Sequence, residues 1–169
     1  MKKSHVLGLA SLAVFAVLAA GCGKKIVINT PNGNVNGTID VNTNSANLNI
    51  NGTTLKTGDV VSLPSDFPTD VYVIDGTIKT SISTPGVGYT VALTTTKTVN
   101  EAKALYDQKL KDNGWTLATS GVIDTHSAAV IAQKGATRSV TVAISDTDGP
   151  TVVTITATSN AATNSATSM

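Results

Sequence analysis

Apolar and polar residues alternate over most of this chain, and one stretch follows a different period. Alternation places every second side chain on the same face, as in a strand with one buried side. The ranges that show it in the second half of the sequence are 77–84, 89–95, 115–120, 127–134, 138–145 and 151–158. Turn-forming residues separate them, such as Pro85-Gly86 between the first two. The pattern predicts antiparallel strands joined by short connections.

The stretch with a different period follows Thr98. Thr98 and Glu101 form a capping-box pattern, in which each side chain satisfies a backbone N–H of the first helical turn. Asn113-Gly114 is a typical helix stop. Apolar residues between these signals recur every three or four positions, at Val99, Ala102, Leu105, Tyr106 and Leu110. We therefore expect one amphipathic helix that packs on the sheet.

These elements predict an α+β domain over residues 59–158, in the order β-β-α-β-β-β-β. The sheet is expected to be mostly antiparallel, with the amphipathic helix packed on one face. Pro64 and Pro68 mark the start of the domain, because proline fixes φ and restricts the residue before it. The small, polar residues 159–169 are expected to form a disordered tail.

An Asn- and Thr-rich segment, residues 22–58, precedes this domain. Short alternating bursts between 26 and 54 are separated by turn signals such as Asn36-Gly37 and Asn51-Gly52, which are typical of hairpins. Few apolar residues are present to bury a core, so two alternatives stay open. The segment forms weak or partner-dependent strands, or it is a flexible stalk.

The first 21 residues have the features of a secretory signal peptide. Lys2 and Lys3 give a positive start, and residues 6–20 form an apolar run that is short for a membrane span. The end of this run, Leu18-Ala19-Ala20-Gly21-Cys22, resembles the lipobox of bacterial lipoproteins. It departs from the usual pattern because the leucine stands four residues before the cysteine instead of three. The resemblance implies cleavage before Cys22 and a lipid on its sulfur; the alternative is ordinary cleavage that leaves a free thiol.

A lipid on Cys22 implies a protein anchored to a membrane of the cell envelope. One acyl chain holds a protein only reversibly, so stable anchoring needs more than one. Lys24 and Lys25 follow the cysteine and could contact anionic headgroups. Gly23 replaces the Asp that retains many enteric lipoproteins at the inner membrane, so the resemblance favours the outer membrane if the organism has one.

Composition excludes several classes of function. The formal charge of +1 becomes −1 once Lys2 and Lys3 are removed with the leader, and aromatic residues make up 4% of the chain. A near-neutral chain with few stacking platforms lacks the features of a nucleic-acid binder. The single cysteine excludes an internal disulfide and a thiolate zinc site.

Candidate catalytic and metal-binding residues are few. His126 is the only histidine after the leader, and Asp124 lies two residues before it. An Asp–His pair is the core of one type of hydrolase, so an envelope hydrolase using these residues is one alternative. Asp146-Thr147-Asp148-Gly149 has part of a calcium-loop pattern, but it lacks the closing glutamate and reads as a hairpin turn. We predict no catalytic residues, no cofactor and no metal site.

Leu-Pro-x-Asp-Phe-Pro before a strand, with a helix that ends in Asn-Gly-Trp, also resembles uncharacterised bacterial lipoproteins, which bring no known activity. The sequence therefore favours a non-enzymatic binding module of the cell envelope. Its partner would be the membrane through Cys22 and an envelope protein or polymer, bound by strand addition to an open sheet edge. A structural or adhesive protein that assembles through residues 26–54 is the other alternative.

Overall fold

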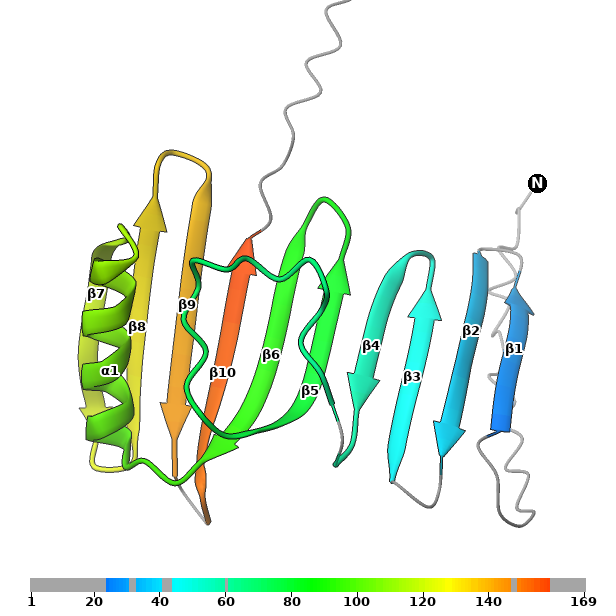
Figure 1. Ribbon diagram of the computed structural model, residues 1–169, viewed down its shortest axis with the longest axis horizontal. Coiled ribbons are helices and arrows are strands. Elements are labelled where there is room, and N and C mark those ends of the chain that lie inside the picture. Colours follow the sequence, from blue (N-terminus) through cyan, green and yellow to red (C-terminus); the bar gives the residue numbers. More distant parts are fainter. Residues whose placement is uncertain (1–23, 31–32, 41–43, 60, 147–148, 159–169) are drawn as a thin grey trace, which may run out of the picture.

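The computed structural model describes residues 24–30, 33–40, 44–59, 61–146 and 149–158, and only the backbone of those before Val35. Its strands are β1 (Lys24–Thr30), β2 (Gly33–Asp40), β3 (Ser45–Ile50), β4 (Thr53–Thr57), β5 (Thr77–Thr84), β6 (Gly88–Thr95), β7 (Thr116–Asp124), β8 (Ser127–Lys134), β9 (Arg138–Ser145) and β10 (Thr151–Thr158). The helix α1 is Val99–Asp112. All ten strands form one antiparallel sheet in the order β1-β2-β3-β4-β5-β6-β10-β9-β8-β7 (Figure 1).

Within the described residues, this arrangement confirms a mostly antiparallel sheet with one helix. The segment from 26 to 54, for which two alternatives were open, contributes strands to the same sheet, because β4 pairs with β5. The predicted turn at Asn51-Gly52 joins β3 and β4, and both residues have a positive φ, of 51° and 87°. Such values are what a two-residue hairpin turn requires.

Three strands differ from the sequence prediction. β2 runs through Asn36-Gly37, which was predicted to be a turn, because its pairing with β3 continues there. β7 runs to Asp124 instead of ending at Ser120, because its pairing with β8 continues through Gly121 and Val122. The pairing of β5 with β6 shifts register between Ile78 and Thr80, as in a bulge at Lys79.

That bulge determines to which face of the sheet the side chains before and after it in β5 point. In a regular strand Ile78 and Ile82 would share a face, since they are four residues apart. The register instead pairs Ile78 with Leu93 and Ile82 with Thr90, which are on opposite faces of β6. The apolar residues of β5 are therefore divided between the two faces of the sheet.

The helix lies on one face of the sheet, which we call the front face (Figure 1). Its ends are those that the sequence predicted. The N–H of Glu101 donates to Oγ1 of Thr98 at 3.3 Å, and the N–H of Thr98 donates to Oε2 of Glu101 at 2.9 Å, so the capping box is confirmed. Gly114 follows the helix with a φ of 79°, a value that favours glycine.

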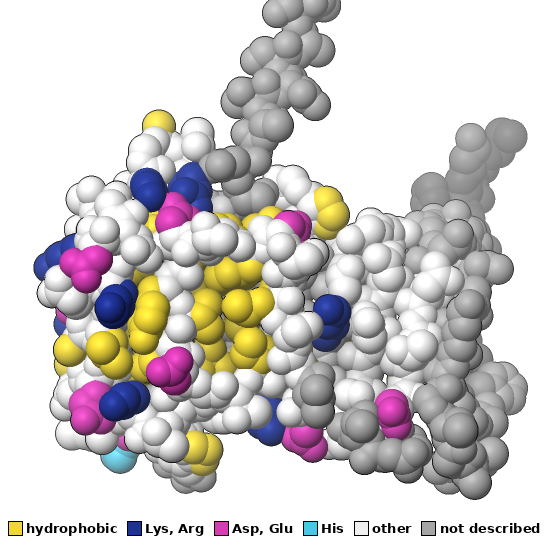
Figure 2. Space-filling model, in the orientation of Figure 1, with side chains coloured by type: hydrophobic (Ala, Val, Ile, Leu, Met, Phe, Trp, Pro, Cys, Tyr) yellow, Lys and Arg dark blue, Asp and Glu magenta, His cyan; other side chains and the backbone are white. Residues whose placement is uncertain are grey.

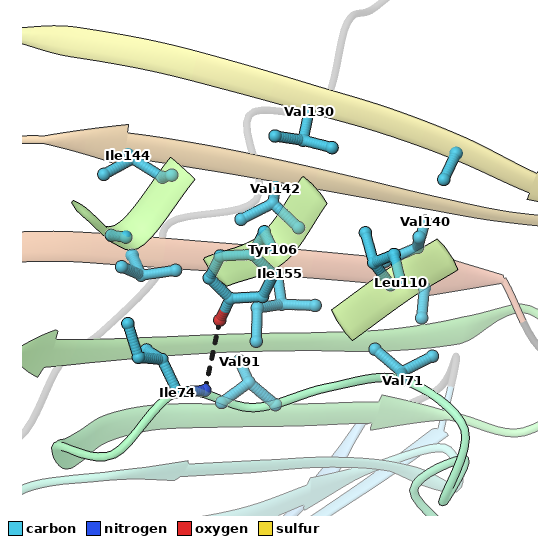
Figure 3. Close-up of a cluster of buried hydrophobic side chains, with 14 of the residues drawn as sticks. Val71, Ile74, Val91, Tyr106, Leu110, Val130, Val140, Val142, Ile144 and Ile155 are labelled. Carbon is cyan, nitrogen blue, oxygen red and sulfur yellow. Dashed lines mark hydrogen bonds between the residues drawn. The ribbon is translucent and has the colours of Figure 1, made fainter. Parts of the chain in front are cut away.

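Residues 61–76, which we call the strap, also cross the front face (Figure 1). The helix and the strap cover one hydrophobic core, and every member of it lies between Phe67 and Ala157. Tyr106 is at its centre and is fully buried. Its Oη accepts a hydrogen bond of 3.3 Å from the backbone N–H of Ile74, which ties the strap to the helix (Figure 3). Burial raises the pKa of the Tyr106 hydroxyl far above its ordinary value.

The front face is polar over the other strands. Figure 2 shows hydrophobic side chains gathered beside the helix, whereas the surface over β3 and β4 is almost entirely uncharged and polar. Alternation puts Asn47 and Asn49 of β3 and Thr54 and Lys56 of β4 on this face. The core therefore lies over the part of the sheet formed by β6, β10, β9 and β8.

Candidate interaction sites

The densest group of charged side chains surrounds Asp70 in the strap. Nη1 and Nη2 of Arg138 donate to its two carboxylate oxygens at 2.6 and 2.7 Å, and Nζ of Lys134 donates at 2.8 Å. The hydrogen bonds from Arg138 hold the pKa of Asp70 well below its ordinary value, against the opposing effect of burial, and Lys134 adds to the lowering. Such a bidentate pairing fixes the orientation of the two side chains and balances their charges.

Trp115 completes this group, which we call the Asp70 clasp. The Arg138 guanidinium lies 4.9 Å from the centre of the indole ring, and indole Nε1 donates to the backbone carbonyl of Asp70 at 2.9 Å. Asn113 Nδ2 donates to the same carbonyl at 3.0 Å. The clasp thus joins the strap, the end of the helix and the β8–β9 hairpin. With its charges paired to one another, the clasp holds the strap in place.

The Asp124–His126 pair considered as an alternative in the sequence does not form through the imidazole ring. Asp124 Oδ1 accepts the backbone N–H of His126 at 2.8 Å, and this bond lowers the pKa of Asp124. The ring instead contacts Asp146, at 2.9 Å between Nδ1 and Oδ1. The His126 side chain is 62% exposed. A ring pairing with Asp146 was missed because the two residues are brought together only by the register of β8 with β9.

A second polar group lies between the helix and β7. Asp107 accepts hydrogen bonds from Lys103 at 2.7 Å and from Ser120 Oγ at 2.5 Å. Burial pushes the pKa of Asp107 up, but these bonds outweigh it and the pKa is lowered. The carboxylate stays ionised, and its contacts attach the helix to β7.

Other residues singled out in the sequence are only partly within the described residues. Cys22 and the positions 147 and 148 of the acidic turn lie outside them, as do the side chains of Lys24 and Lys25. In the described part of the chain, no three His, Cys, Asp or Glu residues gather as a metal site would require. No described helix has the length and apolar character needed to span a membrane.

Two of the surfaces formed by the described residues could take a partner at the sheet edge or on the front face. The first is the outer edge of β7, the last strand of the sheet, which pairs on its other side with β8. Near its end the side chains of Val122 and Ile123 are 53% and 70% exposed. Register shifts between Leu117 and Thr119 and between Val122 and Asp124 leave a regular stretch of only a few residues between them. An edge interrupted in this way can pair with a short extended segment but resists long-range aggregation.

The second surface is an open polar hollow of about 270 Å³ on the front face. It lies where the strap begins, over β2, β3 and β4. Its lining is Thr38, Asp40, Ser45, Ala46, Asn47, Lys56, Thr57, Val61 and Ser62. The Lys56 ammonium contacts Ser62 Oγ at 3.4 Å. The lining is mostly polar and shallow, so the hollow offers little apolar area for a ligand.

Residues 77–151 match the model of a protein family described as START domain-like. The match runs from β5 through α1 to the first residue of β10, which is less than half of the 169 residues. Comparisons with curated proteins and with solved structures give no match. The similarity therefore covers strands that carry the helix and most of the core, and it does not reach β1 to β4.

Proposed function

We propose that this protein is a non-enzymatic binding module, anchored to the cell envelope by a lipid on Cys22. The lipobox-like end of the leader supports the anchor. The similarity of residues 77–151 to a START domain-like family supports a binding role, because domains of this kind are usually binding modules. The described charged groups act as supports of the fold, which agrees with a role other than catalysis.

The edge of β7 is the binding surface that we propose, and its exposed Val122 and Ile123 are the observation that carries the proposal. An extended partner segment would add its backbone to the free N–H and C=O groups of β7, and the two apolar side chains would add selectivity. The short regular stretch implies a weak or transient partner rather than a permanent one.

The position of this edge fits a tethered protein. The other edge of the sheet, β1, starts two residues after Cys22. Nine strand spacings of about 4.8 Å place β7 roughly 43 Å from β1 along the sheet. A lipid on Cys22 would therefore leave β7 at the end of the sheet farthest from the attachment point.

The anchor can be tested by mass spectrometry of the mature amino-terminal peptide. We expect a lipid-modified Cys22, with partition of the protein into detergent, and a Cys22→Ser variant that partitions into buffer. An unmodified thiol on a protein that stays in buffer would overturn the anchor.

The edge can be tested with a photo-crosslinking residue placed at Ile123 in cells. The matched control carries the same residue at Ala104, which is exposed on the helix. We expect a discrete, reproducible adduct from Ile123 that is absent from the control. Equal adducts at both positions, or none from Ile123, would contradict binding at this edge.

Self-assembly is the second candidate function, and one observation favours it. The face of the sheet opposite the helix carries the apolar residues of β2 to β4. Deleting residues 26–54 should then abolish self-association, whereas unchanged self-association would exclude that segment as its cause.

A further inference from the structure

The apolar side chains of β2 to β5 gather on the face opposite the helix, which we call the back face. The register pairs Val35 with Ile50, Leu48 with Leu55, and Leu55 with Ile82, so these residues share one side of four neighbouring strands. We call the set the back patch, and it consists of Val35, Ile39, Leu48, Ile50, Leu55 and Ile82. Gly37 leaves room for Leu48, because a Cβ there would lie 2.3 Å from Leu48 Cδ2.

No described element covers the back patch, since both α1 and the strap lie on the front face (Figure 1). Its side chains shield one another in part, but Ile39 and Ile50 keep 39% and 42% of their surface exposed. An apolar sheet face is normally buried against another layer. The arrangement of the back patch thus calls for an additional layer.

Beyond the patch, the back face stays uncharged over the neighbouring strands β6, β10, β9 and β8. Among the strands β2 to β6 and β8 to β10, the charged residues other than Lys79 alternate onto the front face, and Lys79 sits at the bulge and pairs with Asp59. The back positions of β6, β10 and β9 are Thr90, Ala92, Thr94, Val152, Thr154, Thr156, Thr141, Ala143 and Ser145. Thr90, Thr156 and Thr141 stand in register across three strands.

We infer that the back face binds the back face of a second copy of this chain, forming a two-layer sandwich. Over these eight strands the back face lacks the charged groups that would attract an anionic headgroup or an acidic polymer. It does meet an identical face without repulsion between like charges. The Tyr89 ring contacts Phe67 of the strap, Tyr72 contacts Tyr106, and Trp115 is in the clasp, so these aromatic platforms serve the front face.

The size of the back face matches what a stable dimer needs. The eight strands β2 to β6 and β8 to β10, at about seven residues each, span roughly 34 Å by 24 Å, or about 800 Å². Two such faces in contact would bury on the order of 1,600 Å², and stable interfaces bury about 1,200–2,000 Å² in total. A two-fold axis in the interface would make the contact self-complementary and would close the assembly at two copies.

Sedimentation of the Cys22→Ser chain tests the inference without detergent. We expect twice the mass of one chain at tens of micromolar. The double substitution Ile50→Lys and Val152→Lys places one charge on β3 and one on β10 of the back face, and we expect it to weaken the dimer at least 100-fold. The matched control is Asn49→Lys, next to Ile50 but on the front of the same strand, and it should leave the dimer intact.

Loss of folding is a separate explanation for a monomeric variant, so the near-ultraviolet signal of Trp115 is measured in parallel. A milder variant, Ile39→Thr with Ile50→Thr, retains β propensity and should also weaken the dimer, by about tenfold. A parent chain that is monomeric at 100 µM would overturn the inference. So would equal dimerisation of the double variant (Ile50→Lys with Val152→Lys) and the Asn49→Lys control.

The back-face dimer is independent of binding at β7, and one further variant separates the two. Ile123→Lys blocks the proposed edge and should leave the dimer unchanged. Should Ile123→Lys dissociate the dimer while the back-face lysines do not, the copies pair through their edges and the back-face inference is wrong. If the chain dimerises but the crosslinking residue at position 123 gives no adduct, only the proposed partner of the β7 edge is contradicted.

Discussion

Strands β6 to β10 and strands β2 to β4 belong to one sheet, but they turn their apolar side chains to opposite faces. In the first group, the apolar residues face the helix and the strap, and many are fully buried, such as Val142, Ile144 and Ile155. In the second, they face away from the helix, and residues such as Ile50 stay partly exposed. The bulge at Lys79 in β5 lies where the apolar side changes.

A continuous hydrogen-bonded ladder therefore does not imply a continuous core. Backbone pairing carries the sheet from β5 to β1, yet the buried cluster starts only at Phe67. Burial of apolar area dominates the free energy of folding. We therefore expect the two groups of strands to differ sharply in how much they contribute to stability.

The largest effect is expected from Tyr106→Ala. The substitution removes a fully buried ring and the acceptor of the Ile74 N–H, so it should lower the free energy of unfolding by about 3–5 kcal/mol. The comparison is Leu48→Ala in the back patch, which should cost less than about 1.5 kcal/mol in the monomer because the side chain is already partly in water. Urea denaturation at low protein concentration measures both. Equal losses would mean that the back patch is buried within one chain.

A smaller effect is expected from Asp70→Asn. It leaves Arg138 and Lys134 without their carboxylate in a partly buried place, which should cost about 2 kcal/mol at pH 7. The folded-state pKa of Asp70 lies below the ordinary value of 3.8. The contribution of the ionised carboxylate is therefore complete above that value and is lost as the pH falls below it.

Urea denaturation of the parent chain and of Asp70→Asn from pH 7 to pH 2.5 measures this dependence, and the gap between them should narrow below about pH 4. The control is Asp59→Asn, whose ion pair with Lys79 is exposed on both sides and should contribute no more than about 0.5 kcal/mol. A gap that stays constant with pH would show that the clasp acts through packing instead of charge.

Much of the covered half could be predicted from the sequence. The ranges of β5, β8, β9 and β10 follow from alternation alone, and the capping box and Gly114 fix both ends of the helix. These signals are local, so a single sequence contains them. Which face of β2 to β4 meets the helix is a different matter, because alternation shows that a strand has two faces but not which one turns inward.

The sites depended on contacts between residues far apart in the chain. Asp70 and Arg138 are separated by 68 residues, and nothing in either local sequence indicates the pairing. The Asp-Phe-Pro and Asn-Gly-Trp segments resemble those of bacterial lipoproteins, but this resemblance does not indicate that the two regions are in contact. The bulge at Lys79 also has no local signal such as a glycine, so the alternation over 77–84 gives no sign that Ile78 and Ile82 lie on opposite faces. Similarly, the nearness of Asp124 in the sequence suggested the wrong carboxylate for the His126 ring.

The smallest effect is expected from His126→Ala, and it compares two polar contacts at opposite ends of the β8 strand. The Asp70 clasp includes Lys134 at the end of β8 and is partly buried. The His126 ring, just before the start of β8, is 62% exposed. Water screens the exposed pair and its side chains lose entropy on pairing, so the substitution should change the free energy of unfolding by no more than about 0.5 kcal/mol. Urea denaturation alongside Asp70→Asn measures it under identical conditions. A loss comparable to that of Asp70→Asn would mean that the contact with Asp146 holds its end of β8 and β9 as firmly as the clasp holds the hairpin end, and that exposure is a poor guide to the strength of polar contacts in this fold.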